Sequence, residues 1–174
     1  MRGFVPADAS LISEASSDPL IPLITTVPRT ADPAEALAFI DRQHARLRNG
    51  EGYSLAITVT ATGAAIGQIG LWLRDLAFGR ASVGYWIAPS ARRQGYAAAA
   101  IDVLSSWGLA LPGVHRLELY VEPWNEGSWR AAERAGYRRE GLLRSWQAVG
   151  DERRDMYMYA RLPGGGGSEG AGSE

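Results

Sequence analysis

The chain has 174 residues, 46% of them hydrophobic and 21% charged, which suits one globular domain with a substantial core. A formal net charge of −1 gives no electrostatic reason to expect nucleic acid or a membrane as a partner. The absence of cysteine excludes disulfides, thiolate metal sites and cysteine nucleophiles. No basic segment with an apolar run follows the N-terminus, and no apolar run is long enough to span a bilayer. We therefore expect a cytoplasmic protein.

The first predicted helix begins after Asp32, a favourable N-cap residue, with Pro33 at its first position and Glu35 three residues after the cap. We expect it to end near Asn49 and Gly50. Its predicted apolar face consists of Leu37, Ile40, His44 and Leu47.

Three strand-like runs follow, at residues 53–61, 64–73 and 81–89, with a turn at Thr62 and Gly63. Such closely spaced runs are typical of an antiparallel meander. A helix then begins within the stretch ARRQGYAAAA, residues 91–100, carries Ile101, Leu104 and Trp107, and ends near Gly108.

The last third of the chain predicts a strand at residues 115–123, a short helix at 126–135 that Gly136 ends, and a hairpin of 139–149 and 154–162. The order of elements predicts an α+β fold on one mixed, largely antiparallel sheet flanked by helices. Residues 1–162 form the expected single domain. The Gly-rich remainder, 163–174, cannot bury apolar surface and is expected to be a disordered tail.

The stretch ARRQGYAAAA has the features of an anion site. The N-terminus of a helix presents free N–H groups and partial positive charge, and Gly95 lets backbone approach a ligand. Arg92 and Arg93 add charged donors, so a pyrophosphate would fit there. The alternative is a solvated arginine pair at an ordinary helix start.

A second candidate region follows the strand at 115–123. Pro89 and Pro123 each end a strand, and a parallel crossover would bring both to the same end of the sheet. If those strands splay, an extended ligand can hydrogen-bond along one exposed edge. Asn125 and Ser128 lie where they would contact such a ligand; alternatively, Asn125 is only an N-cap.

These motifs resemble those of a known family. Arg92-x-x-Gly95-x-Ala97, preceded by VGYWIAPSA, resembles the acetyl-coenzyme A (acetyl-CoA) motif of the GCN5-related N-acetyltransferases. VEPWNEGSWRAAERAGYRREGLLR, followed by RDMYMYARL, resembles more narrowly the branch of the bacterial ribosomal-protein alanine N-acetyltransferases (RimJ/RimL-like). The likeness covers roughly residues 3–162.

The resemblance implies the family's fold and an enzyme that transfers acetyl from acetyl-CoA to a primary amine, with no metal and no covalent enzyme intermediate. Its implied cofactor-binding residues are Ile87, Ala88, Arg92, Arg93, Gln94, Gly95, Tyr96, Ala97, Ala98, Asn125, Ser128 and Arg130. Its implied acceptor-binding residues are Tyr85, Trp86, Trp146 and Gln147. A monomer or homodimer is expected.

The same resemblance suggests catalytic groups. Ser128 matches the position from which a hydroxyl meets the departing sulfur. Some relatives present a carboxylate where this chain has Gln147, which is no useful base, so Glu122 is the substitute candidate. Alternatively, Glu122 is a surface residue paired with an arginine, and Asp155 is either an acidic site residue or structural in the hairpin.

Three functions stay open from the sequence. The acceptor is either the α-amine of a protein or peptide, which we expect, or the amine of a small metabolite or antibiotic. A non-catalytic acyl-CoA-binding module is the third.

Overall fold

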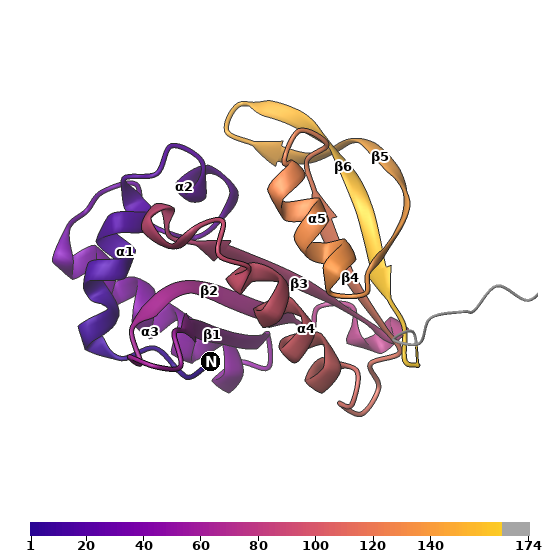
Figure 1. Cartoon of the computed structure of the whole chain (residues 1–174), viewed down its shortest axis with the longest axis horizontal. Coiled ribbons are helices and arrows are strands. Elements are labelled where there is room, and N and C mark those ends of the chain that lie inside the picture. Colours follow the sequence, from indigo (N-terminus) through magenta and orange to yellow (C-terminus); the bar gives the residue numbers. More distant parts are fainter. Residues whose placement is uncertain (165–174) are drawn as a thin grey trace, which may run out of the picture.

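A computed structural model describes residues 1–164 of the chain, and within them the fold is organised by a six-stranded sheet of order β1-β2-β3-β4-β6-β5 (Figure 1). All neighbouring strands pair antiparallel except β3 and β4, which are parallel. The predicted meander, crossover and hairpin are confirmed. The strands are β1 Gly52–Thr58, β2 Ala65–Trp72, β3 Arg80–Ile87, β4 Arg116–Val121, β5 Arg138–Val149 and β6 Glu152–Arg161. The predicted disordered tail lies almost wholly outside the described residues.

Helices cover both faces of the sheet. The α-helices are α1 Ala9–Ser16, α2 Ile21–Ile24, α3 Pro33–Arg48, α4 Tyr96–Gly108 and α5 Glu126–Arg134. One core lies between the sheet and α1 and α3, and includes Phe39 and Trp86; the other lies under α4 and α5, and includes Val83 and Leu104. Figure 1 shows α1–α3 on one side and α5 with the β5–β6 hairpin on the other. None of the helices in residues 1–164 has the length and apolar character needed to cross a bilayer.

The start of α3 is as predicted, but its predicted apolar face is correct only at Ile40. Asp32 accepts the Ala34 N–H at 2.9 Å as N-cap. Leu37 and Leu47 are 43% and 59% exposed. The buried side chains are Ile40, as predicted, together with Ala36, Phe39, Gln43 and Arg46.

α3 turns its buried face toward the sheet because the polar Gln43 on this face finds hydrogen-bond partners there. Gln43 Oε1 accepts hydrogen bonds from Ser54 and Gln68, at 3.1 and 3.0 Å. A buried amide that is hydrogen-bonded in this way avoids the desolvation cost that otherwise keeps it outside. His44 lies off the buried stripe, and its Nε2 contacts the Phe4 carbonyl oxygen at 2.9 Å.

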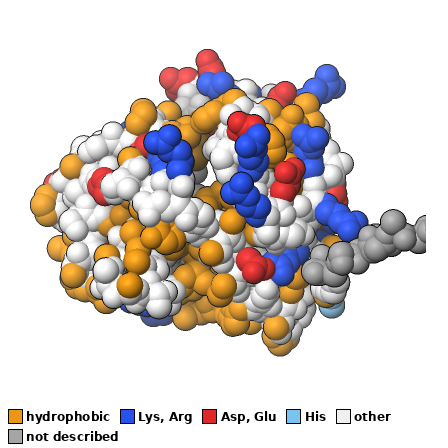
Figure 2. All heavy atoms as spheres, viewed as in Figure 1, with side chains coloured by type: hydrophobic (Ala, Val, Ile, Leu, Met, Phe, Trp, Pro, Cys, Tyr) orange, Lys and Arg blue, Asp and Glu red, His pale blue; other side chains and the backbone are white. Residues whose placement is uncertain are grey.

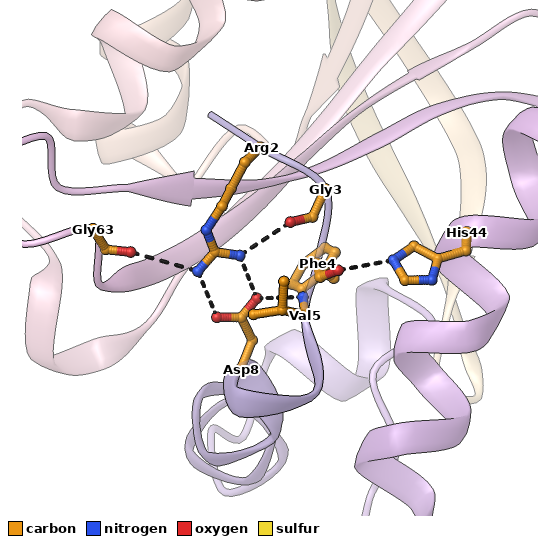
Figure 3. Close-up of polar contacts among 7 residues, drawn as sticks. All are labelled: Arg2, Gly3, Phe4, Val5, Asp8, His44 and Gly63. Atoms are coloured by element: carbon orange, nitrogen blue, oxygen red, sulfur yellow. Dashed lines mark hydrogen bonds and ion pairs between the residues drawn. The ribbon is translucent and has the colours of Figure 1, made fainter.

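The first residues of the chain are held against β1 and α3 (Figure 3). Arg2 forms a two-bond ion pair with the buried Asp8 carboxylate, at 2.7 and 2.8 Å. The same carboxylate accepts the Val5 N–H at 2.9 Å. Burial alone would raise the pKa of Asp8, but the Arg2 and Val5 hydrogen bonds outweigh it and hold that pKa below its ordinary value.

We expect Asp8→Asn to lower the free energy of unfolding by about 1–3 kcal/mol at neutral pH, because a buried charged hydrogen-bond acceptor is lost. Because the pKa of Asp8 is lower in the folded than in the unfolded state, its ionised form stabilises the fold at pH above its unfolded-state pKa of about 4. This stabilisation is lost as the pH falls through the pKa of Asp8 in the folded state. The difference between variant and wild type should therefore shrink toward pH of about 3. Urea unfolding at both pH values tests this, with the exposed Asp41→Asn as control; an Asp8→Asn midpoint equal to wild type at neutral pH would contradict it.

Candidate active site

The two parallel strands of the sheet separate along most of their length. β3 and β4 pair only at Arg80–Arg116, Ala81–Leu117 and Ser82–Glu118. Residues 83–87 and 119–121 then have no partner on the opposing strand. A cleft of about 1090 Å³ opens there and is lined by both strands, by the loop into α4, by α5 and by the segment around α2. Binding of a ligand along a strand edge, as the sequence suggested, requires these two strands to splay, and the structure contains this splay.

Most of the predicted site residues line this one cleft. Two predicted residues, Ala88 and Trp146, do not line the cleft. Ala88 is buried behind the loop, and its N–H donates to Ile66 O at 2.9 Å. Trp146 stacks on Tyr120 at a ring separation of 5.7 Å. The predicted residues that do line it are Tyr85, Trp86, Ile87, Arg92, Arg93, Gln94, Gly95, Tyr96, Ala97, Ala98, Glu122, Asn125, Ser128, Arg130 and Gln147.

The N-terminus of α4 lies at the cleft with its first N–H groups available. Gly95 is the N-cap residue, has a φ of 81°, and caps the helix with no side chain. Arg93 also has a positive φ, 62°, an unusual backbone for a non-glycine residue. Ala99 N–H bonds to Gly95 O, so the N–H groups of residues 96–98 precede the hydrogen-bonded ladder. A Cβ built at Gly95 meets no atom within 4 Å, so the space in front of the helix is open.

Arg92 has a different environment from the one expected of a free anion donor. Its Nη2 donates to Asp18 Oδ2 at 2.7 Å and its Nε to Ile87 O at 3.1 Å. Asp18, which is buried, also accepts the N–H groups of Leu20 and Ile21 at 2.9 Å each. Arg92 thus connects the loop before α4 to the start of α2. Its partner lies 74 positions away, and the sequence carried no signal for that pairing.

Two hydroxyls meet where the strands separate. Ser128 Oγ and the Tyr85 hydroxyl oxygen are 2.8 Å apart. Burial raises the pKa of Tyr85, and the hydrogen bond to Ser128 partly offsets that rise. Asn125 Oδ1 accepts the Ser128 N–H at 3.2 Å, so the capping role of Asn125 is real, and the same residue lines the cleft. Helix capping thereby positions the Ser128 backbone beside Tyr85.

The acidic and basic candidates on the β4–α5 side have local partners. Glu122 is 8% exposed and accepts the Trp124 indole N–H at 2.7 Å, so within residues 1–164 the alternative of a surface glutamate paired with an arginine is not found. Arg130 pairs with Glu126 at 2.7 Å, and its guanidinium carbon lies 5.5 Å from the Trp129 ring centroid. Figure 2 shows basic side chains over α5. These arginines face solvent, where such pairs contribute little to stability.

Two further predictions are resolved by hydrogen bonds. Asp155 is structural: its Oδ1 accepts the N–H of Ser145, whose φ is 52°, at 2.7 Å, where β5 shifts register before Gln147. Trp86 is only 4% exposed and donates its indole N–H to Gln68 at 2.7 Å. Trp86 thus belongs to the core on the α1–α3 face and also forms part of the cleft wall.

One wall of the cleft comes from residues that the sequence reasoning missed. Arg46 on α3 and Trp72 and Arg74 at the end of β2 line it, together with Thr25 and Thr26. An arginine in a helical pattern normally indicates a solvent-exposed position. The sequence therefore carries no sign that Arg46 lies on the buried face of α3 and lines the cleft.

Comparisons with known proteins agree with this geometry. Residues 1–138 match the acetyltransferase (GNAT) domain family. The uncharacterized N-acetyltransferase p20 of Bacillus licheniformis is 27% identical over 155 residues, which cover 89% of this chain and 87% of that protein.

Two solved structures share the fold. Mycobacterium smegmatis RimJ, in complex with CoA-disulfide, superposes with a TM-score of 0.79 at 23% identity, over 93% of this chain and 80% of that one. The microcin C7 self-immunity acetyltransferase MccE, in complex with acetyl-CoA and AMP, gives 0.74 at 18% identity, over 91% of this chain and 88% of that one. With a family match over most of its length and a splayed-strand cleft, the chain belongs to the GNAT family and is an acetyl-CoA-dependent N-acetyltransferase.

Proposed function

We propose that the enzyme acetylates the α-amine of a protein or peptide N-terminus by direct transfer while both substrates are bound. The observation that carries this proposal is the single continuous cleft, in which the open α4 N-terminus, the unpaired edge of β3 and the Tyr85–Ser128 pair occur together. In it, the pyrophosphate of acetyl-CoA would bind the N–H groups of residues 93–98. The pantetheine amides would bind along β3 at Ile87, with Asn125 opposite.

The chemistry follows from the groups around the splay. The amine nitrogen attacks the thioester carbonyl, and the resulting oxyanion accepts hydrogen bonds from N–H groups on the free edge of β3. As the C–S bond breaks, the sulfur takes the proton of Ser128 Oγ, and the Tyr85 hydroxyl, which keeps its own proton, stabilises the Ser128 oxygen by a hydrogen bond until Ser128 regains a proton from water. The proton lost by the attacking amine passes to Glu122 or to water.

Gln147 stands where some relatives have a carboxylate, and a site without that base would favour an α-amine over a lysine side chain. The reference pKa of an α-amine is about 7.7–8.0 and that of lysine about 10.4, so deprotonation at neutral pH costs roughly 3–4 kcal/mol less for the α-amine. The Oε2 atom of Glu122 already accepts a hydrogen bond from the Trp124 indole at 2.7 Å, so this carboxylate is held by the protein and is not directed freely at the amine. Glu122→Gln is therefore expected to lower the rate only several-fold, measured as initial rates of thiol release; a loss of all activity would assign Glu122 as the essential base.

Two matched peptides test the proposal. One has a free N-terminus and blocked lysines, and the other has a blocked N-terminus and one free lysine; both are incubated with enzyme and acetyl-CoA, and acetylation is located by mass spectrometry. We expect transfer to the first peptide, with a rate that rises through the pKa of its α-amine. Faster transfer to the lysine peptide, or transfer only to small amines, would overturn the peptide α-amine as acceptor.

A further inference from the structure

An arginine that the transfer chemistry does not use is buried in the wall of the cleft. Arg46 is 7% exposed and lines the cleft from α3. Its guanidinium carbon lies 3.7 Å from the centroid of the Trp72 ring, and its Nη2 donates to Thr26 Oγ1 at 3.3 Å. Within residues 1–164, no carboxylate lies within ion-pair distance of this guanidinium.

A second arginine contacts the same indole. The guanidinium carbon of Arg74 lies 4.8 Å from the Trp72 centroid, and Arg74 also lines the cleft. Burial lowers the pKa of Arg46 to about 10, with Glu51 acting to raise it and Arg74 and Arg42 to lower it further. Arg46 is still charged at neutral pH. A desolvated cation beside a second cation is costly to keep without a counter-ion, which indicates a missing anionic partner.

The backbone beneath this arginine pair leaves room for the Trp72 indole and the Arg46 guanidinium. Gly70 on β2 lies directly opposite Gly84 on β3. A Cβ at Gly70 would lie 3.6 Å from Arg46 Nη1, and a Cβ at Gly84 would lie 3.7 Å from Trp72 Nε1. Two facing glycines therefore make a flat floor on the α1–α3 face of the sheet.

The position of this floor separates it from the pyrophosphate site. Trp72 pairs with Ser82, the last β3 residue that still pairs with β4, whereas the loop into α4 follows the opposite end of β3. An anion bound by the arginines would therefore belong to the acceptor and not to acetyl-CoA.

We propose that the acceptor carries a carboxylate, close to its reacting amine, that binds between Arg46 and Arg74 beside Trp72. This inference rests on the proposed function, and it narrows the acceptor to an N-terminal segment with an acidic side chain in its first few residues. A guanidinium stacked on an indole keeps donors at its planar edge; one donor of Arg46 bonds to Thr26 Oγ1, and its other N–H groups can bind the two oxygens of a carboxylate. A free amino acid would present the same group, and the experiment distinguishes the two sources.

The test compares kcat/KM for lysine-free peptides with a free N-terminus that differ only in Asp, Asn or Arg at the second or third position. Wild type is expected to prefer Asp over Asn by about 10- to 100-fold at one of these positions, the range for a charged hydrogen bond. Arg74→Gln, at an exposed position, should reduce that ratio toward one, and Arg46→Lys should reduce it because lysine lacks the planar fork. Arg42→Gln, one turn before Arg46 and outside the cleft, is the matched control and should leave the ratio unchanged.

Each outcome separates this inference from the function on which it rests. The carboxylate site would be overturned by equal use of Asp and Asn peptides or by a preference for Arg. An Asp preference that survives both Arg46→Lys and Arg74→Gln would overturn it as well. In each of these cases, acetylation of the peptides would still uphold the proposed function. Transfer to free amino acids over their amides, lost in Arg74→Gln and with no transfer to peptides, would support the carboxylate site and overturn the peptide acceptor. A melting curve of each variant confirms that a changed ratio is not a loss of folding.

Discussion

Gly95→Glu is expected to abolish the stabilisation of the protein by acetyl-CoA. A ligand that binds only the folded state at 100 times its Kd adds about 2.7 kcal/mol, which for a domain of this size raises the melting temperature by roughly 5–10 °C. The space in front of Gly95 is open, so a glutamate there would place its carboxylate where the pyrophosphate is expected. Melting curves with increasing acetyl-CoA measure the effect.

Two controls separate charge from backbone strain. Gly95→Gln has nearly the same shape without the charge and should retain part of the shift. Gly50→Glu introduces the same residue at a similar φ, 69°, in an open position after α3, and should retain all of it. A full acetyl-CoA shift in Gly95→Glu, or none in wild type, would contradict the assignment of this helix start as the phosphate site.

Ser128→Ala should lower kcat by about 100-fold, the lower end of the range for general acid catalysis, with little change in the KM for acetyl-CoA. The reason is that the sulfur needs a proton only as the tetrahedral intermediate collapses. Tyr85→Phe leaves Ser128 without its 2.8 Å partner and should lower kcat less. Steady-state rates of thiol release measure both variants. Unchanged kcat in Ser128→Ala would leave this residue with a structural role only.

Asn125 has two roles that substitutions can separate. Asn125→Ala removes the N-cap of α5 and should cost about 1 kcal/mol of stability, as well as raise the KM for acetyl-CoA. Asn125→Ser keeps a capping oxygen but lacks the amide, so it should raise the KM while the melting temperature stays near wild type. If Asn125→Ser has wild-type KM, capping is the only function of Asn125.

The elements that were predictable are those encoded by neighbouring residues. Asp32 and Pro33 mark the start of α3, and Gly136, with a φ of 79°, follows α5, because caps and left-handed glycines act within a few positions. The alternation of Leu117 and Leu119 with Glu118 likewise identified β4. Local patterns also placed the start of α4, where we propose the phosphate site.

The parts that failed depend on distant partners. The face of α3 was misjudged because Gln43 is buried through hydrogen bonds to Ser54 and Gln68, which compensate for a polar residue in the core. Arg92 is paired with Asp18, and Arg46 stacks on Trp72, through contacts between elements far apart in the chain. Such pairings decide whether an arginine binds ligand or protein, and no periodicity in the sequence carries that information.

Amide hydrogen exchange with and without CoA tests most directly where the cofactor binds. The N–H groups of residues 96–98 precede the ladder of α4, so they should exchange rapidly in the free protein. If the pyrophosphate binds there, CoA should slow exchange at residues 93–98 and around Asn125 and Ser128, and leave α3 residues on the far side of the sheet unchanged. Unaltered exchange at 93–98 under saturating CoA, with protection elsewhere, would show that the pyrophosphate does not bind at the start of α4.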